Sequence, residues 1–181
     1  GWACWKTSVG RPEADVARFM AINQLGNGLC DAQQHEAALS VRQAVLATRR
    51  RIGASENSIL VAQSNLATTY ADLGQHERAL QIERDVYSER LKLQGEEHFE
   101  TLISANNYAD CLMRLKRFEE AKALWRRAMP VARRVLGENH EDTLLLRWSY
   151  AVALRRDDSA TLEDLREAVT MLEDVERIAR R

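Results

Sequence analysis

NLATTYADL, at residues 65–73, decides the fold because a related phrase returns 42 residues later as NYADCLMRL at residues 107–115. The segment that follows returns as well, with ERAL at 77–80 matched by EEAK at 119–122. A fixed period of this size is typical of a repeat protein whose helical units stack on their neighbours. We therefore expect a helical repeat protein whose function is binding.

Further copies extend the pattern in both directions. QHEAAL at 34–39 matches QHERAL at 75–80, and GEEHFETL at 95–102 returns as GENHEDTL at 137–144. The glycine of each connector stands where a helix should stop, and the acidic residues after it favour a new helix start. Each repeat is thus predicted to consist of a helix, a short turn, a second helix and a connector.

A fourth copy begins at residues 148–154, which align with 106–112. Its turn, residues 155–161, is longer by about five residues, and the pattern then continues at an offset of 47. We predict an irregular segment over 1–11 and one solenoid domain over 12–181, with repeats at about 12–53, 57–95, 99–137 and 141–181. The expected fold class is all-α, a right-handed α-solenoid of four helix-turn-helix repeats. The sequence is expected to stop inside a connector.

Composition argues against several classes of function. The 181 residues are 45% hydrophobic and 29% charged with a formal net charge of −1, so there is no overall field to attract nucleic acid or an acidic membrane. No apolar run reaches the roughly 18 residues of a transmembrane helix. The three cysteines, Cys4, Cys30 and Cys111, are odd in number and form no C-x-x-C pair. Free thiols in a reducing compartment are expected, and hence a cytoplasmic location.

The repeated residues resemble the tetratricopeptide repeat (TPR), in the 42-residue form found in kinesin light chains. The resemblance rests on Leu66-Ala67, Tyr70 and Ala79, on their counterparts around Tyr108-Ala109, and on the two Gly-Glu-x-His connectors. The proline that usually follows the connector histidine is replaced by Phe99 and Glu141, and the heptad coiled coil of the light chains is absent. The resemblance implies a relative of these repeats rather than a kinesin light chain itself.

Helix pairing gives the repeated alanines a role. The three alanines of the first helices are expected to face four alanines of the second helices, because larger side chains would hold the two helices apart. The first set is Ala67, Ala109 and Ala151, and the second is Ala38, Ala79, Ala121 and Ala168.

Catalysis and metal binding are not predicted. The four histidines recur with the repeat, His35 and His76 at the turn and His98 and His140 at the connector, so we expect them to cap helix ends. No H-E-x-x-H, G-x-S-x-G, phosphate-loop or Cys/His motif occurs. The chain is therefore expected not to be an enzyme, with no cofactor and no metal site. Arginine runs at 49–51, 126–127 and 133–134 are expected to be solvated helix ends, and a phosphate site is the alternative.

A concave groove remains as the candidate site. The first helix of each repeat should line it, and asparagine recurs there at Asn23, Asn65 and Asn107, near where related repeats hold a peptide backbone. The alternative is that these asparagines bind a neighbouring repeat. The predicted peptide-binding residues are Asn23, Asn27, Asn65, Thr68, Asp72, Asn106, Asn107, Asp110, Arg114, Trp148 and Arg155.

The sequence thus predicts a non-catalytic protein-interaction module or scaffold that binds a peptide or a partner helix. The partner is expected to be a protein or peptide, not nucleic acid or a membrane, and the edges of the terminal repeats could support self-association. The alternative function is a structural or regulatory repeat segment of a larger signalling ATPase-type protein, packing in cis.

Overall fold

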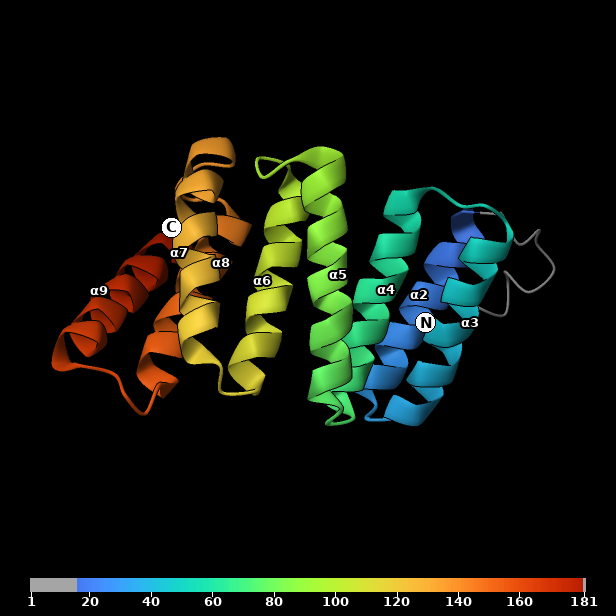
Figure 1. Ribbon diagram of the computed structural model, residues 1–181, viewed down its shortest axis with the longest axis horizontal. Coiled ribbons are helices and arrows are strands. Elements are labelled where there is room, and N and C mark those ends of the chain that lie inside the picture. The colour runs from blue at the N-terminus through green and yellow to red at the C-terminus, as the bar shows by residue number, and fades with distance from the viewer. Residues whose placement is uncertain (1–15, 181) are drawn as a thin grey trace. The chain divides into compact units, whose positions relative to one another are not determined.

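The computed structural model describes residues 16–180 (Figure 1). Within that range it contains eight helices and no strand, which agrees with the predicted helix pairs. The chain divides into two compact units, Gly1–Ile82 and Glu83–Arg181, whose boundary falls inside α5. The predicted irregular segment 1–11 lies outside the described residues. The helices are α2 (Val16–Asp31), α3 (His35–Arg51), α4 (Glu56–Asp72), α5 (His76–Gln94), α6 (Phe99–Arg114), α7 (Phe118–Val135), α8 (Glu141–Arg156) and α9 (Leu162–Ala179).

In the first unit, α3 packs against both α2 and α4. Val45 and Leu46 of α3 meet Ala62 and Leu66 of α4 in a buried cluster. Tyr70 packs against the edge of this cluster. The first helices of the two repeats are thus joined through the second helix of the first repeat.

In the second unit, α7 packs against α6 and α8, and α9 packs against α8. The helices α6 and α8 also touch, so the first helices of the third and fourth repeats are neighbours. The largest fully buried side chains here are Trp125 of α7 and Tyr150 of α8. Any surface shared by two successive first helices is therefore formed, within this unit, by α6 and α8.

The repeated alanines are all buried. Six of the seven have no exposed surface, and Ala168 is 2% exposed. Their burial agrees with the predicted role of small residues in the helix pairs, since a larger side chain at a closed position would have to displace its neighbours.

Glycines end the second helices, as predicted. Gly53, Gly95 and Gly137 have positive φ angles of 65°, 81° and 101°. This left-handed conformation is unfavourable for residues with a Cβ atom, so glycine is the usual choice after a helix end. In the turn inside the third repeat, Lys116 adopts the same left-handed conformation, with a φ of 59°.

The connector histidines cap helices, and the turn histidines do not. Nδ1 of His98 accepts a hydrogen bond from the backbone N–H of Glu100 at 3.2 Å, and His140 does the same for Asp142 at 3.3 Å. His35 and His76 are instead the first residues inside α3 and α5, and Nδ1 of each is buried without a hydrogen bond. The predicted capping role is confirmed for the first pair and wrong for the second, because a cap must lie before the first helical residue.

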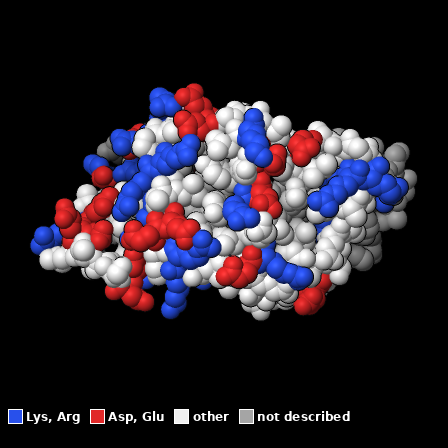
Figure 2. Space-filling view, in the orientation of Figure 1, with Lys and Arg blue, Asp and Glu red and all other residues white. Residues whose placement is uncertain are grey.

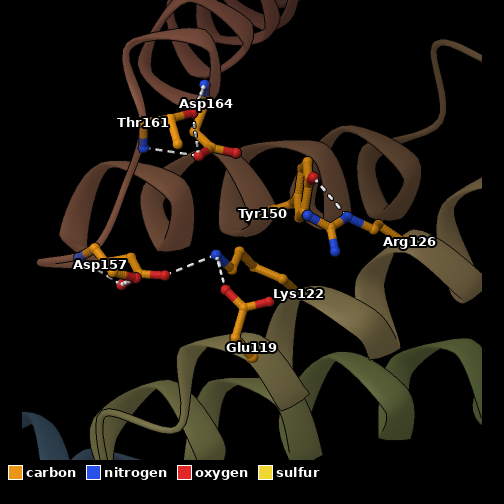
Figure 3. Close-up of polar contacts among 8 residues, drawn as sticks. Glu119, Lys122, Arg126, Tyr150, Asp157, Thr161 and Asp164 are labelled. Carbon is orange, nitrogen blue, oxygen red and sulfur yellow. Dashed lines mark hydrogen bonds and ion pairs between the residues drawn. The ribbon is translucent and has the colours of Figure 1, made fainter.

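The longer turn of the fourth repeat is held by a buried ion pair (Figure 3). Nζ of Lys122, on α7, lies 2.7 Å from Oδ2 of Asp157, which directly follows α8, and also pairs with Glu119. The Lys122 and Asp157 side chains are only 4% and 6% exposed. Asp157 Oδ1 accepts hydrogen bonds from the backbone N–H and hydroxyl of Ser159 at 2.9 and 2.7 Å. The inserted residues are therefore anchored to the preceding repeat.

The protonation of Asp157 reflects this anchor. Hydrogen bonds from Lys122 and Ser159 lower the pKa of Asp157 from 3.8 to about 2. Burial by itself lowers the pKa of Lys122, but the hydrogen bonds to Asp157 and Glu119 outweigh burial and raise it. Both groups are therefore charged at neutral pH.

Replacing Ala109 by Phe should destabilise the third repeat. Ala109 has no exposed surface, so the added ring must separate α6 from α7. We expect a loss of at least about 1–3 kcal/mol in the free energy of unfolding, measured by chemical denaturation. Ala123→Phe is the matched control, because Ala123 is exposed on α7 and should cost well under about 1 kcal/mol. Equal losses in the two variants would contradict the assigned helix pairing.

Asp157→Asn should destabilise the second unit in a pH-dependent way. The folded-state pKa of Asp157 lies below its ordinary value of 3.8, so its contribution is present above that pH and is lost as pH falls towards about 2. At neutral pH we expect a loss of about 1–3 kcal/mol, since the Lys122 ammonium is left with Glu119 alone.

The measurement is urea denaturation of both proteins from pH 7 to pH 2. The difference between them should shrink across the acidic window. Asp158→Asn is the control, since Asp158 is the exposed neighbour of Asp157. A difference that did not change with pH would mean that the charge of Asp157 plays no part.

Candidate protein-binding surface

The predicted groove residues lie on the first helices of the repeats. Each unit carries its own set. The boundary in α5 lies between α4, the first helix of the second repeat, and α6, the first helix of the third repeat. In the first unit, α2 carries Asn23 and Asn27, and α4 carries Asn65, Thr68 and Asp72. In the second unit, α6 carries Asn106, Asn107, Asp110 and Arg114, and α8 carries Trp148 and Arg155.

Arg42 ties together the first-helix residues of the first unit. Its side chain is buried, and it donates hydrogen bonds to Asn27 Oδ1 at 2.9 Å, to Thr69 Oγ1 at 2.7 Å and to the backbone carbonyl of Asn65. Asn27 is thereby engaged within the fold. This arginine was not among the predicted site residues, although its spacing from Leu39 and Leu46 places it on the buried side of α3.

Three other predicted residues of the first unit differ in exposure. Thr68 is exposed, and its hydroxyl donates to the backbone carbonyl of Ser64 at 3.2 Å. Asn23 is half-buried, and Asp72 is exposed at the end of α4. Thr68 and Asp72 are therefore the predicted residues most open to solvent on α4.

On α6, the predicted residues divide between fold and surface. Oδ1 of Asn106 accepts a hydrogen bond at 2.9 Å from Nε1 of Trp125, whose ring is fully buried. Asn106 thus satisfies the polar atom of a core residue. Asn107 is half-buried, and Asp110 forms an ion pair with Nε of Arg114 at 2.8 Å.

On α8, two large apolar side chains face solvent. Trp148 is 49% exposed and Leu145 is 44% exposed, and their spacing of three residues puts them on one side of the helix. We call Leu145 and Trp148 the α8 apolar pair. Ser149 and Val152 of the same helix are buried, at 7% and 8% exposure. The exposed apolar part of α8 is therefore narrow.

Two arginines of the second helices link successive repeats. Arg49 is 5% exposed and donates to the backbone carbonyl of Ser58, and Arg90 is 3% exposed and donates to that of Glu100 at 2.7 Å. The expectation of a solvated helix end is wrong for Arg49, because its guanidinium satisfies a carbonyl in the first turn of the next helix. The recurrence of arginine after 41 residues was the available signal.

The other arginine runs carry matching acids. Arg127 pairs with Glu96 at 3.1 Å, Arg134 with Glu97 at 2.7 Å, and both arginines are well exposed. Figure 2 shows basic and acidic side chains interspersed over the visible face of each unit. A phosphate site needs a cluster of positive charge, and arginines that are paired with glutamates do not form one. No helix in the described part of the chain has both the length and the apolar character needed to cross a membrane.

Solved structures similar to the chain come from several organisms. A variant of a putative kinesin light chain of Podosopora anserina with nearly identical TPR-like repeats matches with a TM-score of 0.72 and 22% identity, over 96% of this chain and 79% of that one. BtubC (BKLC) from P. vanneervenii matches with a TM-score of 0.68 and 15% identity, over 99% and 86%. Bacillus thuringiensis PlcR, solved with the peptide PapR7 and DNA, matches with a TM-score of 0.72 and 16% identity, over 99% and 63%. No curated protein sequence matches.

The model of the tetratricopeptide repeat family matches residues 18–88 and 100–181, most of the chain. The predicted all-α solenoid class is confirmed by this match together with the paired helices of both units and the structural likeness to kinesin light chain repeats. The chain belongs to the tetratricopeptide repeat family, with repeats similar to those of kinesin light chains.

Proposed function

We propose that this chain is a non-catalytic protein-interaction module that holds an extended peptide or a partner helix against the first helices of its repeats. The observation that carries the proposal is the α8 apolar pair, since Trp148 and Leu145 are about half exposed on a helix that touches α6. Tryptophan is among the residues that contribute most to binding when a partner covers it. Leaving such a side chain in water gives no comparable benefit to folding.

Polar groups on α6 could fix the direction of a bound peptide. An asparagine amide offers a donor and an acceptor, which match the C=O and N–H of one extended residue. Asn107 stands 42 residues after Asn65, so both units have the same group at the same place in the repeat. Arg114, exposed at the end of α6, pairs with Asp110, so this end of the helix presents a charge pair to a partner.

The comparisons support the general class of function. The tetratricopeptide repeat fold suggests a scaffold for protein interaction, and the similar PlcR structure contains the peptide PapR7. That structure also contains DNA. For the present chain a protein or peptide is the better candidate, because its formal net charge is −1 and exposed arginines of α7 are paired with glutamates.

A second candidate is a structural or regulatory segment that packs in cis, for example within a larger signalling ATPase-type protein. Leu162, Leu165 and Val169 favour it, because these side chains are 64%, 38% and 55% exposed on α9. A covering element supplied in cis would bury them. The two functions differ in whether the isolated chain binds a partner in trans.

Trp148→Ala should abolish most of the affinity for peptides selected on the wild-type protein. The probe is a displayed library of random 15-residue peptides, and the selected peptides are then synthesised and titrated. Loss of a buried tryptophan contact costs about 2 kcal/mol or more, so affinity should fall about 30-fold. Asn107→Ala should lower it by up to about tenfold.

Leu93→Ala is the matched control, since Leu93 is 55% exposed on α5, the second helix of its repeat. Thermal melts of all variants separate binding from stability. The proposal is supported if affinity falls in the Trp148 variant while its melting temperature is kept. It fails if the library yields no binder, or if Leu93→Ala weakens binding as much as Trp148→Ala does, and a failure to find any binder would favour packing in cis.

A further inference from the structure

Three potential metal ligands from separate helices of the first unit meet at the turn of the first repeat. Cys30 lies in the last turn of α2, His35 is the first residue of α3, and Asp72 is the last residue of α4. The thiol sulfur, one imidazole nitrogen and one carboxylate oxygen all lie within 4.8 Å of one another. Cys30 and His35 are five residues apart across the turn, and the packing of α4 against α3 brings Asp72 beside them.

From this cluster we propose that Cys30, His35 and Asp72 form a site for a divalent transition-metal ion of the Zn²⁺ class. Zn²⁺ is bound by Cys, His and Asp at about 2.0–2.3 Å, so its ligand atoms lie roughly 3.3–3.8 Å apart in a tetrahedron. Closing the cluster from 4.8 Å therefore needs movements of about 1 Å, within the reach of side-chain rotation. A thiolate with an imidazole favours Zn²⁺ over Mg²⁺ or Ca²⁺, which prefer oxygen ligands.

The histidine is an independent sign of an unmet bonding need. Nδ1 of His35 is buried and has no hydrogen-bond partner. A buried polar atom in this state is costly, and an unplaced ion is one of the causes that such an atom can have. His76, at the same position of the next repeat, also has an unpartnered Nδ1, so this feature alone does not single out the first repeat.

What singles out the first repeat is the other two ligands. The residue 41 positions after Cys30 is Ala71, and the residue 42 positions after Asp72 is Arg114. The second repeat thus keeps the histidine and lacks the thiol and the carboxylate. Repetition accounts for His35 as part of the fold, and Asp72 matches Asp31 at the end of the preceding first helix, whereas Cys30 has no counterpart in the second repeat.

The surroundings of the cluster suit a site that exchanges with solvent. Cys30 and His35 are half-buried and Asp72 is exposed, so an ion can enter from the Asp72 side. Sγ of Cys30 lies 3.9 Å from Oγ1 of Thr69, which also accepts a hydrogen bond from Arg42. Arg42 brings one positive charge to the buried side, and the thiolate and carboxylate together supply two negative charges against it.

Binding would proceed by ligand exchange alone. The Cys30 thiol loses its proton to solvent as the sulfur–metal bond forms, and no electron is transferred. Three protein ligands leave one tetrahedral position open for water or for a side chain of a partner. The site shares no residue with the α8 apolar pair or with Asn107. It makes Asp72 a metal ligand, whereas the sequence predicted Asp72 to bind a peptide.

The test titrates the full chain with Co²⁺ alone, under a phosphine reductant, and then displaces Co²⁺ with Zn²⁺. Thiolate ligation of Co²⁺ gives a charge-transfer absorption band in the near ultraviolet. We expect one Co²⁺ per chain, with the band absent in Cys30→Ser. Affinity should be at least about tenfold weaker in Asp72→Asn, since even supporting residues of metal sites are worth that much. Zn²⁺ should raise the melting temperature of the wild type but not that of Cys30→Ser.

Matched controls are His76→Gln and Asp110→Asn, which remove a similar histidine and a similar acid elsewhere and should leave the titration unchanged. Cys111 is unsuited to metal binding, because burial, with Glu83 and Asp110 adding to it, raises the pKa of its thiol to about 12. A thiolate band that persists in Cys30→Ser, or an equal loss in His76→Gln, would overturn the proposal. If Cys30→Ser fails to fold, full-strength Co²⁺ binding by Asp72→Asn would overturn it as well.

Discussion

Close approach of paired helices through alanine is the constraint on which the other features depend. Ala67 and Ala109 have no exposed surface, and their counterparts on the second helices are equally buried. At such short separations, the helix backbones leave little space for polar side chains between them. A buried charge in this chain therefore needs a defined partner at the edge of a helix pair.

Those partners are backbone carbonyls and carboxylates. Arg49 and Arg90 each donate to a carbonyl in the first turn of the next repeat, and Lys122 meets Asp157. A buried cation left alone would cost far more than these contacts return, so the pairs specify geometry more than they add stability. The lengthened turn of the fourth repeat is an example, because its residue Asp157 forms an ion pair with Lys122 of the preceding repeat (Figure 3).

The first helices carry the differences among repeats. In the first unit, Asp72 lies beside a thiol and a histidine, and in the second unit α8 exposes Trp148 beside α6. A fold whose core positions repeat is free to vary the residues that do not pack, so binding functions are most naturally placed there. The proposed peptide surface and the proposed metal site both use such positions. The peptide surface uses the exposed side of a helix, and the metal site uses residues at helix ends.

The sequence by itself determined the repeat. Its period, the alanine pairs, the glycine stops and the connector histidines could all be predicted, since each is a local requirement that recurs every 41 or 42 residues. Tertiary structure decided which polar residues of the first helices belong to the fold. Asn27 and Asn106 satisfy Arg42 and Trp125, whereas Trp148 stays exposed, and the periodic pattern treated all of them alike. The cluster of Cys30, His35 and Asp72 was not predicted, because Asp72 comes from α4 and meets the other two, which flank one turn, only when the helices pack.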